Sequence, residues 1–208
     1  MIAKRHALLA LMAMTVLAGA AMAVEEPAFK QVLREGDFEL RDYPALVVAE
    51  VTVTGDQKEA AGTGFRLLAR YIFGGNKRRE RVAMTAPVIQ QATSEKIAMT
   101  APVAQTRGSA GTWVIRFTMP RRWTLETLPV PDDARVNLRA LQPTRLAVLT
   151  FSGRVQPGDI EAKSSELMAL VASHKLRADG PVSLAQYNPP LTPGFMRRNE
   201  VMVEVGSR

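Results

Sequence analysis

The side chains of this sequence offer few ways to do covalent or metal chemistry. His174 is the only histidine outside residues 1–23, and the chain contains no cysteine. Sites that need several His or Cys ligands from one chain, thiolate catalysis, disulfide bonds and thioether-linked haem are therefore excluded. The G-x-S-x-G, H-E-x-x-H and phosphate-binding-loop motifs are also missing from the sequence. These features predict a binding protein and no enzymatic activity.

Glu50 is the carboxylate whose position suggests a specific role. It interrupts an apolar run and shares a strand face with Leu46 and Val48, because side chains on one face of a strand recur every second residue. A carboxylate on an apolar face costs free energy unless it is paired. One interpretation is a structural ion pair with Arg41 or Arg139. The other is a counter-ion for a cationic, apolar ligand, and the sequence leaves both open.

Residues 1–23 are predicted to be a signal peptide. They combine a basic start at Lys4 and Arg5, an uncharged apolar run and the small-x-small tripeptide Ala21–Ala23, so cleavage is expected before Val24. We therefore expect an exported protein, periplasmic if the source is Gram-negative. The alternative is an uncleaved anchor, although the apolar run is short for a span of about 20 residues. No second apolar run is long enough, so no stable membrane span is expected after cleavage.

The mature chain is moderately basic. Loss of Lys4 and Arg5 reduces the 27 basic residues to 25 against 20 acidic ones, a net charge of +5. This excess favours anionic ligands or surfaces. No basic stripe interleaved with aromatic residues occurs, so no nucleic-acid partner is expected.

The elements that must position these residues alternate between strands and helices. A polar leader, residues 24–37, precedes strands at 38–43 and 46–54, and a helix is expected at about 57–73 with Asp56 as its N-cap. Further strands are predicted at 113–119, 182–187 and 201–205, with a second helix at about 157–176. Residues 39–55 and 137–153 align without a gap at an offset of 98 residues, with five identities in seventeen positions. The pattern suggests two related halves, about 38–119 and 134–206.

The pentapeptide Met-Thr-Ala-Pro-Val occurs twice, at Met84–Val88 and Met99–Val103. The polar residues between the copies predict a hairpin across 81–103 that bends at its prolines, because proline has no N–H to pair. Four further motifs accompany the pentapeptide: Phe38–Pro44, Tyr71–Asn76, Phe117–Pro120, and Tyr187–Pro190 with Arg197–Val201. Together the five motifs closely resemble the SOUL haem-binding proteins over roughly residues 38–205.

The resemblance implies an α+β fold for a single domain over residues 38–208. In this fold, antiparallel strands curve into a partly closed, distorted barrel, two helices pack outside it, and the two halves are pseudo-symmetric. The fold is also similar to the effector-binding domains of bacterial multidrug-responsive regulators. Both groups of relatives bind small molecules against the sheet and helices.

The resemblance further implies non-covalent binding of haem or a related tetrapyrrole. Such a ligand needs an apolar slot and cations near its propionates, and Arg66 and Arg70 on the polar face of the first helix are the predicted cations. The predicted apolar walls are Leu67, Tyr71, Met84 and Met99. His174, near the end of the second helix, is the candidate axial ligand, with a structural role as the alternative. Attachment without a histidine ligand also remains open.

Two other functions compete with haem binding. A pocket for other amphipathic molecules, cationic ones included, would use Glu50, and its lining would be acidic rather than arginine-rich. An envelope scaffold or protein-interaction domain would have a filled barrel and an exposed apolar patch in place of a cavity.

Overall fold

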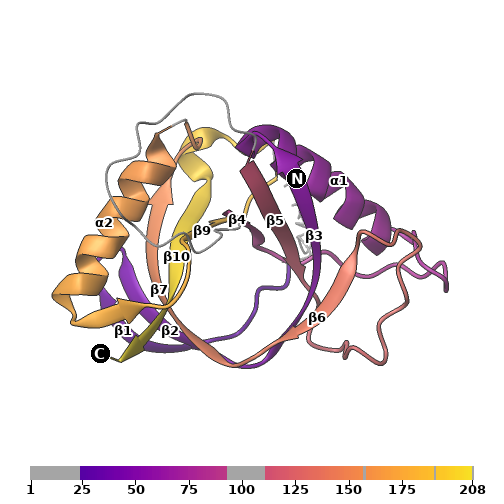
Figure 1. The fold of residues 1–208 in the computed structure, drawn as a ribbon, viewed down its shortest axis with the longest axis horizontal. Helices are drawn as coiled ribbons and strands as arrows, with labels where there is room; N and C mark the ends of the chain where they lie inside the picture. The colour runs from indigo at the N-terminus through magenta and orange to yellow at the C-terminus, as the bar shows by residue number, and fades with distance from the viewer. Residues whose placement is uncertain (1–23, 93–110, 157, 190, 208) are drawn as a thin grey trace, which may run out of the picture.

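The protein folds as one curved antiparallel sheet with two helices on its outer side (Figure 1). The computed structural model describes residues 24–92, 111–156, 158–189 and 191–207. The helices are α1 (Gln57–Ile72) and α2 (Asp159–Ser173), with a short 3-10 helix, η1 (Gly194–Met196). The strands are β1 (Lys30–Glu35), β2 (Phe38–Tyr43), β3 (Leu46–Gly55), β4 (Val88–Ala92), β5 (Gly111–Thr118), β6 (Asn137–Leu141), β7 (Thr144–Ser152), β8 (Leu176–Ala178), β9 (Ser183–Gln186) and β10 (Arg198–Ser207).

The sheet is open. Its strand order is β1-β2-β7-β10-β9-β4-β5-β3-β6, and β8 pairs with β10 beside this path. The predicted α+β architecture with two outer helices is confirmed. The barrel expected from the resemblance is not closed, because the two ends of the path, β1 and β6, are not paired with each other among the described residues.

The two halves meet through a reciprocal exchange of strands. β2 pairs with β7, and β3 pairs with β6. The register places Leu40 opposite Ala147 and Ala49 opposite Leu138, which are equivalent pairs under the predicted offset of 98 residues. The internal repeat therefore corresponds to two equivalent strand pairs, which lie towards opposite ends of the sheet.

Helix α1 packs on β3 and β5 and begins where the sequence predicts. The Asp56 carboxylate accepts a hydrogen bond from the Glu59 backbone N–H at 2.9 Å, which satisfies one free donor of the first turn. Gly64 allows the helix to lie close to the sheet, since a Cβ there would come within 2.4 Å of the Ile115 side chain. Leu68, Ile115 and their neighbours form the core under this helix.

Helix α2 covers the other half of the sheet and is shorter than the predicted 157–176. Leu167 and Val171 point into a second core with Phe38 and Leu40. The helix ends at Ser173, and the predicted axial ligand His174 is its C-cap residue. Pro157, the expected first helical residue, lies outside the described residues.

The predicted hairpin across 81–103 falls only in part within the described residues. In its first arm, Val88–Gln91 pair with β5 on one side and with β9 on the other. The first pentapeptide leads into β4 through a cis Ala86–Pro87 bond. The second pentapeptide lies outside the described residues.

The predicted leader, whose order the sequence left open, contributes to the sheet. Residues 30–35 form β1, which pairs with β2. Further upstream, the Glu25 carbonyl accepts a hydrogen bond from the Ala86 N–H at 3.0 Å. The segment 24–29 thus leads from the residues just before β4 to the start of β1.

Candidate ligand-binding site

The inner, concave face of the sheet carries the buried charges. Phe38 and Leu40 face α2 on the outer side, so the alternating residues Glu39 and Arg41 face inwards. By the same alternation, Glu50 points inwards from β3. All three side chains are buried. A buried charge is stable only when it is paired with an opposite charge, and each of these three side chains has such a partner.

Glu50 lies at the centre of the first inner cluster. Its carboxylate accepts hydrogen bonds from Arg116 Nε at 2.7 Å and from an Arg139 guanidinium N–H at 3.0 Å. Burial by itself raises the pKa of Glu50, but the hydrogen bonds and charges of the two arginines outweigh it and hold the pKa below its usual value. Arg116 also donates to the Gln91 side chain at 3.1 Å. The carboxylate therefore fixes two cations on the inner face.

Arg41 and Glu200 form the second inner cluster. Two guanidinium N–H groups of Arg41 donate to the two carboxylate oxygens of Glu200 at 2.9 and 3.1 Å, and Arg41 Nε donates to Glu39 at 2.7 Å. The Tyr187 hydroxyl donates to Glu200 at 2.5 Å. Burial lowers the pKa of Arg41, but the hydrogen bond and charge of Glu200 outweigh burial and raise it. This cluster is a connected network in which Arg34 and Arg198 also pair with Glu39 and Glu200, at 3.6 and 3.8 Å.

A cleft of about 470 Å³, which we call the inner cleft, opens on the concave face. Its volume lies in the range of small-molecule sites. Arg116 and Arg139 line it, and Tyr43 lines it from the side of the second cluster. The acidic residues Asp179 and Glu204 also contribute to its wall. The cleft is thus bordered by cations that Glu50 holds in place, with carboxylates elsewhere on the wall.

The apolar lining of the inner cleft comes from both halves of the repeat. Val48 and Leu146, which are equivalent at the offset of 98 residues, both line it. Other apolar lining residues are Leu46, Ile89, Leu141 and Met202. The cleft therefore lies where the two halves exchange strands.

The N-terminal segment 24–29 forms part of the rim. Pro27 lines the inner cleft. The Phe29 ring lies against Tyr43, with ring centroids 5.3 Å apart, and the Arg41 guanidinium lies 4.5 Å from its centroid. An ion pair between Glu26 and Arg198 holds the same segment to β10. This segment therefore covers the second cluster and narrows the cleft.

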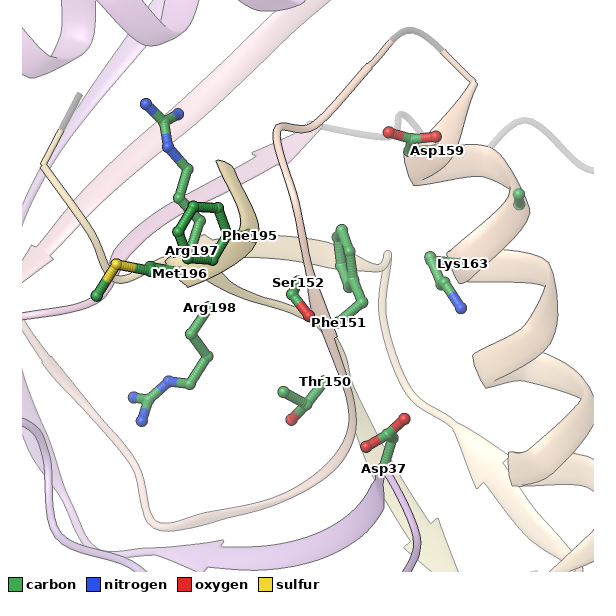
Figure 2. A pocket seen from close by; sticks show the side chains of 11 residues that line it. Asp37, Thr150, Phe151, Ser152, Asp159, Lys163, Phe195, Met196, Arg197 and Arg198 are labelled. Carbon is green, nitrogen blue, oxygen red and sulfur yellow. The ribbon is translucent and has the colours of Figure 1, made fainter. Parts of the chain in front are cut away.

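A second hollow, the outer groove, lies between α2 and η1 and has a volume of about 610 Å³. Figure 2 shows Asp159 and Lys163 projecting from α2, with Phe195 and Met196 on the opposite side. The end of β7, including Phe151, separates the two sides. The lining mixes both charges with apolar side chains, and apart from Asp37 it belongs to the second half of the repeat.

The structure separates the predicted ligand residues from the inner cleft. Arg66 and Arg70 are exposed on α1, on the outer side of the sheet, and neither lines the inner cleft or the outer groove. Leu67 and Met84 pack against the core under α1. Tyr71 is buried in that core, and its hydroxyl donates to the Pro129 carbonyl at 2.9 Å. Burial raises the pKa of Tyr71 to about 12.

Met99 lies outside the described residues. Glu50 faces inwards as the alternation predicts, and Arg139 is its partner as one interpretation expects. Arg41, the other suggested partner, binds Glu39 and Glu200 instead.

His174 lies away from both hollows. Its ring stacks on Phe38 with centroids 5.0 Å apart and an interplanar angle of 12°. Its Nε2 is 3.4 Å from a Glu35 carboxylate oxygen. Among the described residues, no group of three or more His, Cys, Asp or Glu side chains is arranged to hold a metal ion. These contacts suit the structural role that was the alternative for His174.

Sequence reasoning missed Arg116 as a site residue. The signal was present, because residues 113–118 alternate and place Arg116 between Val114 and Thr118 on one strand face. What the sequence could not supply was the pairing of β5 with β3, which puts Arg116 directly opposite Glu50.

Within the described part of the chain, no helix is long and apolar enough to cross a membrane.

Comparisons with known proteins agree with this geometry at the level of family and fold. The family model described as SOUL heme-binding protein matches residues 24–204. A comparison with curated protein sequences found no match. The crystal structure of the EcmrR C-terminal domain is similar at a TM-score of 0.60 and 7% identity, covering 82% of this chain and 98% of that one.

Two further structures share the fold. The chain covers 57% of EcmrR in a cryo-EM structure of an EcmrR–DNA complex, again at a TM-score of 0.60 and 7% identity over 82% of this chain. A crystal structure of a hydrolase from Listeria innocua is similar at a TM-score of 0.56 and 14% identity, covering 82% of this chain and 92% of that one. At these identities the likeness concerns the fold alone.

Proposed function

Because this chain belongs to the SOUL haem-binding protein family, we propose that it binds haem or a related tetrapyrrole non-covalently in the inner cleft. The observation that carries the proposal is the pair Arg116 and Arg139, which Glu50 holds at the border of an apolar cleft. A planar apolar ring with two carboxylates matches this combination. The apolar lining would exclude water from the ring, and the guanidinium groups would bind its carboxylates.

The residues of the cleft fit a tetrapyrrole held mainly by packing and charge. Arg139 is accessible, with 54% of its side chain exposed, so it is available to an incoming carboxylate. The two arginines already bind Glu50, and a ligand carboxylate would share them with that residue. His174 does not line the cleft, so the proposed attachment uses no histidine. A bound haem would supply the redox and ligand-binding chemistry of its iron, and this chain would supply orientation and solubility.

The test is a titration of residues 24–208 with haem, followed by the Soret absorbance. Wild-type protein is expected to saturate at one haem per chain. The double variant Arg116→Gln/Arg139→Gln is expected to bind at least about tenfold more weakly, because it removes two charge-assisted contacts. The matched control Arg66→Gln/Arg70→Gln removes the same charge from α1 and is expected to bind like wild type. Equal loss in both variants, or no saturable change in wild type, would contradict the proposal.

A pocket for amphipathic cations is a second candidate. Glu204 is exposed on the wall of the inner cleft, and its carboxylate makes no hydrogen bond or ion pair among the described residues. An amphipathic cation would bind there through apolar burial and Coulombic attraction. Glu204→Gln would weaken the binding of such a cation. It would leave the affinity for a dianionic tetrapyrrole unchanged or slightly higher, so this one variant separates the two candidates.

A protein-interaction role rests on a different observation. The loop between β9 and β10 exposes three large apolar side chains: Leu191 by 97%, Phe195 by 82% and Met196 by 61%. Exposed apolar side chains near one another mark contact surfaces. A scaffold domain without a small ligand would have a filled interior, so the presence of the inner cleft favours a small ligand. Leu191→Ser/Phe195→Ser would abolish a protein contact without changing haem binding.

We also propose that the protein acts as an exported carrier rather than an enzyme. The support is the family, together with the signal-like composition of residues 1–23. Intact-mass measurement of protein recovered from the extracytoplasmic fraction is expected to give a chain that begins at Val24. Recovery of a chain that begins at Met1 in that fraction would contradict cleavage.

A further inference from the structure

A strongly basic patch lies at the end of α1, away from the inner cleft. The segment 70–81 contains five basic residues and one acidic residue, a net charge of +4, whereas the whole chain from Val24 onwards carries +5. We call these residues the basic patch: Arg70, Lys77, Arg78, Arg79 and Arg81. All five are exposed. Most of the excess charge of the mature protein is therefore concentrated in one short segment.

The patch is held in a defined shape by the loop that precedes β6. The Lys77 N–H donates to the Val130 carbonyl at 2.9 Å, and an Arg78 guanidinium N–H donates to the Thr127 carbonyl at 2.9 Å. Asp132 forms ion pairs with both Lys77 and Arg79 at 3.3 Å. In Figure 1 these two loops lie side by side beyond the end of α1. The cations therefore sit on an ordered surface formed by two segments.

Two large apolar side chains are exposed on the same two segments. Phe73, the C-cap residue of α1, is 62% exposed, and Val130 is 61% exposed. The hydrogen bond from Lys77 to Val130 joins their segments directly. Exposed apolar groups surrounded by cations match the composition of surfaces that bind at the boundary between lipid headgroups and acyl chains.

We propose that the basic patch, with Phe73 and Val130, binds the surface of an anionic phospholipid bilayer. Each cation near such a surface strengthens binding by roughly fivefold, and these factors multiply over several cations because the free energies add. Phe73 and Val130 enter the headgroup layer and bury apolar area that is exposed in the free protein. Two weak signals of different kinds, charge and apolar insertion, then give reversible association without a membrane span.

Lipid is favoured over nucleic acid by the residues between the cations. Nucleic-acid grooves are bound by basic stripes with aromatic side chains interleaved for base stacking. Here one aromatic and one aliphatic side chain are exposed, and Val130 offers nothing to a base or a phosphate. The patch is compact and not extended along a strand or helix, which suits a flat anionic surface.

The test is sedimentation of residues 24–208 with vesicles, using either phosphatidylcholine alone or a mixture containing about a third phosphatidylglycerol. Wild-type protein is expected to bind only the anionic vesicles, and binding is expected to fall as salt rises. In Arg70→Glu/Arg81→Glu, binding is expected to fall at least about twentyfold. Neither side chain makes a hydrogen bond or a close ion pair among the described residues, and the longer-range attraction of Arg70 to Asp133 lies at the protein surface, so the fold is expected to persist.

Two further variants keep the test sharp. Phe73→Ser/Val130→Ser is expected to weaken binding by roughly tenfold while the salt dependence remains, because it removes only the apolar part. Lys30→Glu/Lys58→Glu makes the same charge change at exposed positions outside the patch and is expected to bind like wild type. Equal loss in this control, binding to neutral vesicles, or tight binding of a DNA oligonucleotide without vesicle binding would overturn the proposal. Thermal denaturation of each variant confirms folding, and haem titration of the same samples reports separately on the inner cleft.

Discussion

Arg41 and Arg139 lie at equivalent positions of the two halves, 98 residues apart, and each donates hydrogen bonds to a buried glutamate on the inner face. The side chain of Arg41 is only 6% exposed and is enclosed by its network, whereas that of Arg139 is 54% exposed at the cleft. The same residue type therefore serves stability in one half and is accessible to a ligand in the other.

Glu200→Gln is expected to destabilise the protein by about 3 kcal/mol, because the buried Arg41 guanidinium loses the charged partner of two of its hydrogen bonds and keeps only Glu39. Urea denaturation followed by circular dichroism measures this change. Asp42→Asn is the matched control, since it breaks a carboxylate–arginine pair with Arg145 that solvent screens, and it is expected to cost much less than Glu200→Gln. Similar losses in the two variants would contradict the assignment of a buried network.

Glu50→Gln is expected to strengthen haem binding by roughly fivefold and to weaken binding of an amphipathic cation, because it removes the charge that competes for Arg116 and Arg139. Parallel titrations with haem and with a cationic dye measure both affinities. A weaker affinity of the variant for haem, together with a stronger affinity for the dye, would contradict the claim that Glu50 competes with haem for the two arginines.

The contribution of Glu50 to stability is expected to depend on pH. The arginines hold its folded-state pKa below the value of about 4.5 that the unfolded chain has, so its stabilisation is complete above that pH. The stabilisation is then lost as pH falls through the folded-state pKa. The difference in unfolding free energy between wild type and Glu50→Gln should be constant from pH 7 to about 5.5 and shrink at lower pH. A difference that grows on acidification would contradict the ion-paired state.

His174→Ala is expected to cost about 1 kcal/mol through loss of its stacking on Phe38, and to leave the Soret position of bound haem unchanged. Thermal denaturation and absorbance of the same sample measure the two effects. His174→Phe preserves an aromatic ring and should restore most of the stability. A shifted Soret band in both variants would instead identify His174 as an axial ligand.

Local patterns were sufficient to predict much of the fold. Asp56 marks the start of α1 because its carboxylate caps the helix, and the alternation around Glu50 identified the face on which it lies. The offset between Arg41 and Arg139 revealed the repeat. These features depend on residues close together in the chain or on direct alignment.

The predicted ligand residues on α1 lie away from the inner cleft, because helix periodicity does not say which side of a sheet a helix covers. Arg66, Leu67 and Tyr71 belong to a helix on the outer side, so one is exposed and the other two pack on the core. The inner cleft depends on pairing between distant strands, β3 with β5 and β6, which brings Arg116 and Arg139 to Glu50. No local pattern encodes that pairing.

The central claim is that the ligand lies on the inner face, and methionine methyl NMR tests it most directly. Three methyl groups report on separate places: Met202 in the inner cleft, Met84 in the core under α1 and Met196 in the outer groove. Substituting each methionine with leucine assigns its signal. On addition of zinc protoporphyrin to residues 24–208, we expect the largest shift at Met202, with Met84 and Met196 little changed. A large shift at Met196 or Met84 with Met202 unmoved would contradict the inner cleft as the binding site.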